Sequence, residues 1–178
     1  ITLAVNNSYE LAKNYIDEKR NKVQSDIVLV AYDLDKNAIL FKNNIKILQN
    51  FLKTQRLLRG LDQIHIIDKN RKVLFSSSET PYLPIEKKAI KMVLNDDKPL
   101  KIINAYQNKS AAIIKIKSMN NLFLYVVKFL DQDISNYLKE SEEAINFYYT
   151  VEDQRTGIKF SFALIYIIIV TLLLFLSI

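Results

Sequence analysis

The residues with the strongest chemical potential are few and lie far apart in the sequence. The chain contains one histidine, His65, and no cysteine, so the sequence excludes both a tight zinc site and a thiolate nucleophile. The acidic pairs Asp96–Asp97 and Glu142–Glu143 are each adjacent in sequence, and adjacent helical positions point about 100° apart. Neither pair therefore predicts the converging carboxylates of acid–base catalysis. Ser76, Ser77 and Ser78 lack a motif that would activate a serine nucleophile, and we expect them to form a loop.

Glycine is equally scarce, and this excludes a glycine-rich nucleotide site. The chain has two glycines, Gly60 and Gly157, whereas a phosphate-cradling loop needs several close together. We therefore predict that this chain is not an enzyme, has no catalytic residue and no metal site, and carries no cofactor of its own.

The charge pattern argues against nucleic acid as a partner. The chain carries 25 Lys and Arg against 19 Asp and Glu, a formal net charge of +6. The basic residues are interleaved with acids, as in Asp17-Glu18-Lys19-Arg20, and no basic block reaches five residues. Dispersed charge of this kind is typical of a solvated surface. Anionic lipid headgroups stay open as partners.

The C-terminal residues predict a membrane anchor. No charged residue occurs from 160 to 178, and this length suits a helix that crosses a hydrocarbon core of about 30 Å. Arg155 and Lys159 precede this segment, where their side chains can reach headgroups. Residues 1–5 form an apolar stub, either a disordered start or the end of a first transmembrane helix. We therefore expect the chain to be a fragment of a longer membrane protein.

Between these ends the sequence predicts helix, then sheet, then helix. Residues 6–58 contain neither Gly nor Pro, and an apolar stripe begins at Ile16 and runs to Phe41. Asn43 and Asn44 are expected to cap a second helix over 45–58. Gly60 stands where a left-handed C-cap residue is expected.

Residues 59–131 have the pattern of a five-stranded antiparallel sheet. Strands are predicted at 61–67, 72–76, 100–106, 111–117 and 122–129, with a short helix at 85–94. Polar turns at 107–109, which include Lys109, and at 118–121 separate the last three strands. Asp131 or Asp133 should cap a connecting helix over 132–159, interrupted only by Gly157, which leads into the transmembrane helix. This is an α+β plan, the plan of the PAS-like or Cache sensor modules.

Several segments resemble the sensor region of membrane-bound two-component histidine kinases of the NtrY type. These are residues 58–61 (Leu-Arg-Gly-Leu), residues 66–74, residues 124–131, and Tyr149, Glu152, Arg155, Gly157 and Ile158 leading into residues 162–166. The resemblance implies a periplasmic sensor domain between two spans of a bacterial inner membrane. It also implies a HAMP linker, a cytoplasmic PAS domain, a kinase that uses ATP and Mg, and a response regulator as partner. No part of that kinase lies in this chain.

By analogy with PAS-like modules, we place a ligand on the sheet face that points away from the long helix. Strand alternation puts Gln63, His65 and Ile67 on one face. A pocket lined by His65, Tyr106, Lys115 and Tyr125, with Arg59 at its mouth, would suit a small anion such as a carboxylate. The alternative is a half-buried sheet whose lysines reach outward, in a domain that has no ligand and signals through its dimer.

The predicted mechanism is mechanical. A ligand, or a change in packing of a homodimer, would shift the sheet against the first helix. Asp131 and Gly157 mark the helix that would carry this shift to the cytoplasm as a piston or rotation. The competing function is a membrane-anchored interaction module that binds a protein partner without transmembrane signalling.

Overall fold

The computed structural model describes residues 2–94, 99–104, 108–142 and 165–169. Its labelled elements follow in chain order: α1 (Thr2–Lys36), α2 (Ala38–Asn43), α3 (Ile45–Leu58), β1 (Gln63–Asp68), β2 (Val73–Ser78), α4 (Lys87–Leu94), β3 (Leu100–Asn104), β4 (Lys109–Lys115) and β5 (Leu122–Phe129). A further helix covers residues 132–142, and residues 165–169 are also helical. This confirms the α+β plan with a long N-terminal helix and an antiparallel sheet.

The apolar stripe of α1 is the face that packs on the sheet. Val23, Ile27, Val30 and Leu34 are all buried and lie in one core cluster with residues of β1, β4 and β5. The helix breaks at Asn37, whose side chain donates to the Asp33 carbonyl, and the apolar stripe continues beyond this break. The break places the last residues of the stripe on α2.

Both predicted boundaries of α3 are present. The Asn44 side chain accepts hydrogen bonds from the amides of Lys46 and Ile47, which are two of the amides that a helix start leaves unpaired. At the other end Gly60 has a φ of 61°, and the amide of Leu61 donates to the Arg56 carbonyl at 2.9 Å. This is the left-handed C-terminal turn that favours glycine, and it turns the chain from α3 into β1.

The strands form one sheet in the order β2-β1-β5-β4-β3, and every neighbouring pair is antiparallel. β1 and β2 form the predicted hairpin, and β3, β4 and β5 form the predicted meander. Pairing of β1 with β5 joins the two parts, so residues about sixty positions apart in sequence lie side by side.

Two strand assignments from the sequence were wrong. Ser77 and Ser78 belong to β2 rather than to a loop, since the backbone of 76–78 pairs with β1 from Gln63 to His65; Ser76 was already the last residue of the predicted strand 72–76. Lys109 was placed in a turn but is the first residue of β4, where it pairs with Phe129. Backbone pairing overrides the local turn preference of Ser and Lys at both places.

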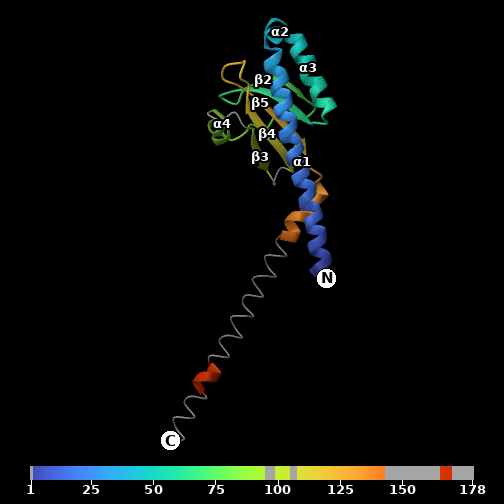
Figure 1. Cartoon of the computed structure of the whole chain (residues 1–178), viewed down its shortest axis with the longest axis vertical. Coiled ribbons are helices and arrows are strands. Elements are labelled where there is room, and N and C mark those ends of the chain that lie inside the picture. The colour runs from blue at the N-terminus through green and yellow to red at the C-terminus, as the bar shows by residue number, and fades with distance from the viewer. Residues whose placement is uncertain (1, 95–98, 105–107, 143–164, 170–178) are drawn as a thin grey trace.

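The two sheet faces are covered by different helices. α1 and α3 pack on one face, and α4 packs on the other, as Figure 1 shows. Alternate residues of the central strands therefore enter two separate cores: Ile64, Ile66, Leu124 and Val126 face α1, whereas Ile67, Ile113, Phe123 and Tyr125 belong to the α4 side.

The chain leaves the sheet at Asp131, which is the cap that the sequence offered as one of two choices. Its carboxylate accepts from the amides of Asp133 and Ile134 at 2.9 and 3.1 Å. The helix of 132–142 begins there and coincides with the first part of the predicted connecting helix. Residues 143–159, with Arg155, Gly157 and Lys159, lie outside the described residues.

The predicted transmembrane segment also falls mostly outside the described part of the chain, which includes only residues 165–169 of it. Within the described residues, no helix combines the length and the apolar character that crossing a membrane requires.

Candidate functional site

The predicted site lies on the sheet face that points away from α1. Alternation on β1 is as the sequence predicted, with Ile67 in the α4-side core and Ile66 in the α1-side core. In the sheet register His65 pairs with Tyr125 of β5 on one side and with Ser76 of β2 on the other. The structure therefore brings His65 and Tyr125 together, two of the five predicted ligand-binding residues.

Two tyrosine rings enclose the His65 imidazole. The Tyr82 ring meets it edge-on with centroids 5.0 Å apart, and the Tyr125 ring lies nearly parallel to it at 6.1 Å. The tyrosine rings are themselves perpendicular to each other at 6.1 Å. With these neighbours, only 1% of His65 is exposed to solvent, so the ring is separated from water.

A chain of hydrogen bonds fixes the tautomer of His65. The Gln63 amide nitrogen faces the Pro81 carbonyl at 3.2 Å and the Thr80 hydroxyl. A carbonyl only accepts, so this nitrogen is the donor and the Gln63 oxygen must face the Nε2 atom of His65, 3.2 Å away. Nε2 therefore carries the proton, and Nδ1 accepts from the Ser76 hydroxyl at 2.9 Å.

Burial sets the protonation states of this cluster. It lowers the pKa of His65 from 6.5 to about 4, because an imidazolium would lose its hydration. Burial raises the pKa of Tyr125 well above its usual value, and the neighbouring Tyr82 adds to this effect. Burial also raises the pKa of Tyr82. At neutral pH all three side chains are uncharged hydrogen-bonding groups.

The cation at this face is Lys109, which the sequence reasoning missed. Its Nζ atom donates to the Tyr125 hydroxyl at 3.3 Å, and only 6% of the residue is exposed. Desolvation lowers the pKa of this lysine. Alternation along β4 was a usable signal, since Lys109 shares a face with Ile113, but we expected Lys109 to lie in a turn.

Of the remaining predicted residues, Lys115 shares the predicted sheet face with Ile113, whereas Arg59 lies on the other side of the sheet. Arg59 ends α3 on the α1 side of the sheet, where its guanidinium binds the Asp26 carboxylate of α1 at 3.0 Å and so does not stand at the mouth of the predicted pocket. Lys115 is the last residue of β4 and pairs with Phe123, two residues from Tyr125. Tyr106 falls outside the described residues.

The contact between Ser76 and His65 has the spacing of a serine nucleophile and its base. The rest of the arrangement does not suit catalysis. A general base works best with a pKa near the operating pH, and His65 has a pKa of about 4. The group behind His65 is the neutral Gln63 amide, which cannot stabilise an imidazolium as a carboxylate does. The arrangement is suited to binding through hydrogen bonds and aromatic surface.

Metal binding has little support in the described part of the chain. No group of three or more His, Cys, Asp or Glu side chains gathers there to hold an ion.

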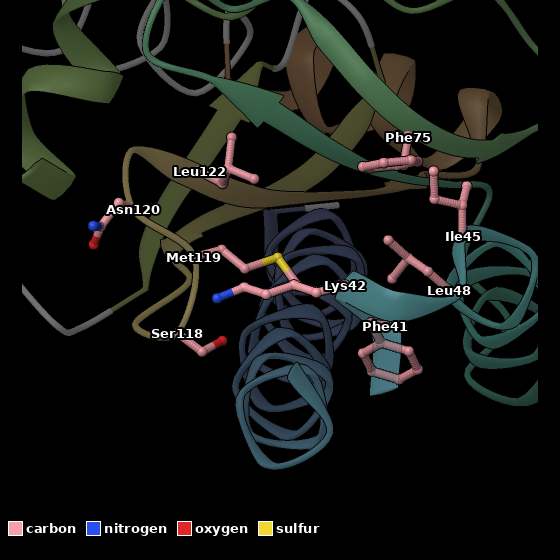
Figure 2. Close-up of a pocket in the computed structure, with 9 residues that line it drawn as sticks. All are labelled: Phe41, Lys42, Ile45, Leu48, Phe75, Ser118, Met119, Asn120 and Leu122. Atoms are coloured by element: carbon pink, nitrogen blue, oxygen red, sulfur yellow. The ribbon is translucent and has the colours of Figure 1, made fainter. Parts of the chain in front are cut away.

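A second recess lies on the α1 side of the sheet, where α2 and the start of α3 meet the turn between β4 and β5. Its volume is about 450 Å³, and Phe41, Leu48 and Met119 supply part of an apolar wall. Lys42 extends along it beside Met119 (Figure 2). The Ser118 hydroxyl oxygen is buried there and makes no hydrogen bond with the described residues.

Comparison with known families gives a match across almost the whole chain. The family model of the NtrY N-terminal region matches residues 3–173. Among curated proteins, the nitrogen regulation protein NtrY of Azorhizobium caulinodans is 26% identical over 97% of this chain and 23% of its own length. A putative NtrY-like sensor histidine kinase of Rickettsia conorii is 24% identical over all of this chain and 30% of its own length. The chain thus spans less than a third of these relatives.

Solved structures show the same fold at low sequence identity. The ligand-binding domain of the Campylobacter jejuni chemoreceptor Tlp3, in complex with 4-methylisoleucine, aligns with a TM-score of 0.53 at 15% identity, over 74% of this chain and 59% of that one. The sensor domain of the V. cholerae histidine kinase DctB also aligns with a TM-score of 0.53, at 13% identity, over 77% of this chain and 60% of that one.

Proposed function

This chain belongs to the NtrY N-terminal region family, and from that premise we propose that it is the signal-input region of a membrane-bound sensor histidine kinase. The observation that carries the proposal is the extent of the match, which runs from α1 through the sheet and on to residue 173. The fold supports it, since a chemoreceptor domain and a kinase sensor domain share its architecture. In the whole protein, we infer a periplasmic sensor held in a bacterial inner membrane.

The catalytic part would belong to the rest of the protein. The curated relatives are three to four times longer than this chain, and their names describe nitrogen regulation or sensor histidine kinases. We infer that the intact protein autophosphorylates with ATP and Mg and passes the phosphoryl group to a response regulator. Purified intact protein incubated with labelled ATP tests this, and this chain alone should incorporate no label.

We place ligand recognition on the His65 face. The face offers neutral hydrogen-bonding groups, aromatic surface and the Lys109 ammonium, which together suit a small molecule that carries a carboxylate. The polar groups of this face are already hydrogen-bonded to one another, Lys109 to Tyr125 and Ser76 to His65. A ligand here would therefore replace internal hydrogen bonds, and so change how β4, β5 and β1 are tied together.

A thermal denaturation panel of amino acids, carboxylates and nitrogen compounds tests for such a ligand. A compound that binds only the folded state at a hundredfold excess over its Kd stabilises by about 2.7 kcal/mol. Lys109→Met should abolish the shift, whereas Lys53→Met, at an exposed lysine of α3 on the other side of the sheet, serves as the control. A shift that survives Lys109→Met places the ligand elsewhere, and a silent panel with a folded protein favours a domain that senses a partner.

We further propose that this chain forms a homodimer through the outer face of α1. Val28, Leu29 and Tyr32 are 42%, 50% and 63% exposed on that face, with Asn21 and Ser25 beside Val28 and Leu29 along a shallow recess. Tyr32→Glu should shift the molecular mass in solution from dimer to monomer while the unfolding midpoint of the domain stays close to that of the wild type. An unchanged mass would exclude this surface.

Signal transmission would follow the helix that begins at Asp131. A Gly-Pro insertion near Gln154 should uncouple the kinase from its stimulus while leaving the sensor folded, because the pair interrupts a continuous helix. The thermal midpoint of the sensor domain separates uncoupling from misfolding. Normal signalling by the insertion variant would contradict a mechanical link.

A further inference from the structure

A pocket of about 540 Å³ lies between the β1–β2 turn and α4, away from the His65 cluster. The turn contributes Lys69 and Arg71, and α4 contributes Lys87 and Lys91. Between these cations the pocket is lined by apolar side chains of α4, Ile90 and Leu94. Four basic side chains from two separate elements therefore surround one concave surface.

No acidic side chain is among the described residues that line this pocket. None of its four cations forms an ion pair with an acid in the described part of the chain. Two acids are adjacent in sequence to these cations, Asp68 before Lys69 and Glu86 before Lys87, and neither lines the pocket. The Asp68 carboxylate accepts from the amides of Asn70 and Lys72 at 2.8 and 2.9 Å. Within the described residues, the positive charge of the pocket is thus not paired with an acidic side chain.

The side chain of Arg71 is held in a defined position in the pocket. Its φ is 68°, and it follows a tight turn closed by the bond from its amide to the Asp68 carbonyl. Glycine is the usual residue at such a left-handed hairpin position, so arginine is held there against its backbone preference. The guanidinium donates to the Ile85 carbonyl at 2.9 Å, which fixes its direction and leaves its other donors for a ligand.

We propose that this pocket binds a small, multiply charged oxyanion with two or more phosphate or carboxylate groups. Arginine and lysine together favour such groups, arginine by its planar fork and lysine as a point charge. The apolar residues of α4 would contact the carbon skeleton of an organic anion. The pocket is also linked to the His65 cluster, because the Tyr82 hydroxyl donates to the Arg71 carbonyl at 3.2 Å.

The alternative is a solvated group of lysines with no ligand. A pair of matched variants separates the two, since Lys72 and Lys88 adjoin the pocket in the turn and in α4 without lining it. The pocket variant is Lys69→Gln/Lys87→Gln, and the control variant is Lys72→Gln/Lys88→Gln. Both are exposed pairs that lose the same charge from the same two elements, so a general effect of net charge would be equal in them.

The experiment is titration calorimetry of the full chain, in mild detergent at low salt, with pyrophosphate and with citrate as probes. We expect saturable binding of at least one probe, weakened roughly tenfold in the pocket variant and less than twofold in the control. Arg71→Gly, which suits the turn geometry, should also weaken binding while leaving the domain folded. This proposal concerns binding alone and holds whether or not the chain signals to a kinase.

The two probes identify the source of the anion, because pyrophosphate binding alone indicates phosphate groups and citrate binding alone indicates carboxylates. Absence of binding by both would overturn the proposal, as would equal weakening in the two paired variants. If the pocket variant does not fold, Lys91→Gln alone provides the test, with Lys88→Gln as its control on the same helix.

Discussion

The protonation of His65 offers the sharpest test of the described structure. The imidazole is enclosed by Tyr82 and Tyr125, and burial lowers its pKa from 6.5 to about 4. The unfolded chain would hold the ordinary value. As the pH falls from 6.5 to 4, the unfolded state takes up a proton that the folded state does not, so the free energy of unfolding must decrease over that window.

The size of this effect follows from the shift. Each unit of pKa difference corresponds to about 1.4 kcal/mol, so a change from 6.5 to about 4 corresponds to about 3 kcal/mol. The conversion is appropriate because only 1% of the residue is exposed. Domains are stable by about 5–15 kcal/mol, so one buried histidine would account for a large part of the stability lost on acidification.

Two measurements check this prediction, and both use the fact that the chain has one histidine. With ¹⁵N-labelled histidine and a purification tag that lacks histidine, the ring nitrogens of His65 report its pKa directly, and should also show the proton on Nε2. Urea denaturation across the same pH range then compares the wild type with His65→Gln. The variant loses the titrating group but keeps a donor, so its stability should fall less steeply between pH 6.5 and pH 4.

The comparison also removes the contribution of carboxylates, which titrate in both proteins. A measured pKa of 6 or above would refute the burial of His65 that the structure shows. Parallel stability profiles for the wild type and the variant would refute the thermodynamic reasoning even if the pKa were low. A proton on Nδ1 instead of Nε2 would contradict the hydrogen bonds assigned to Gln63 and Ser76.

Four further substitutions, compared by urea denaturation, test other features of the structure. Tyr125→Phe leaves the Lys109 ammonium buried without its oxygen partner and should cost about 1–3 kcal/mol. Adding Lys109→Met should recover most of that loss, and additive costs would contradict the contact. Asp26→Asn removes the ion pairs to Arg59 and Lys22 and should cost about 1–3 kcal/mol. Gly60→Ala should cost about 1 kcal/mol in the free energy of unfolding, because alanine disfavours the left-handed backbone at this position. A Cβ there would meet no atom within 4 Å, so a much larger loss would indicate a steric clash that the structure does not show.

The fold was predictable where local signals agreed with the tertiary structure. The stripe through Val23, Ile27 and Val30 has helical spacing, and the same residues are buried against the sheet. Asn44 and Gly60 mark the ends of α3 because a cap needs a particular residue type at a particular place. The alternation in β1 predicted which face carries His65, since side chains on a strand alternate strictly.

The composition of the site was less predictable, because it depends on residues that meet only after folding. Tyr82 follows β2 in a segment without strand or helix, and no periodicity predicts that its ring covers His65. Lys109 was assigned to a turn because it ends a polar run, 107–109, between two strand-like segments. Its buried partner, the Tyr125 hydroxyl, lies 16 positions later and is not evident from that local pattern. Arg59 was assigned to the ligand by charge alone, whereas its partner, Asp26, lies 33 positions earlier.

The end of β5 connects this site to the rest of the protein. Asp62, just before β1, accepts from the Phe129 amide at 2.7 Å and pairs with Lys128 at 3.2 Å. From the other side, the Leu130 amide donates to the Asn108 carbonyl, just before β4. The strand that carries Tyr125 is thus tied to both of its neighbours immediately before the helix that Asp131 caps. If the pairing of Tyr125 with Lys109 or His65 changes, we expect the change to reach the helix through this strand end, because only residues 130 and 131 separate β5 from the helix.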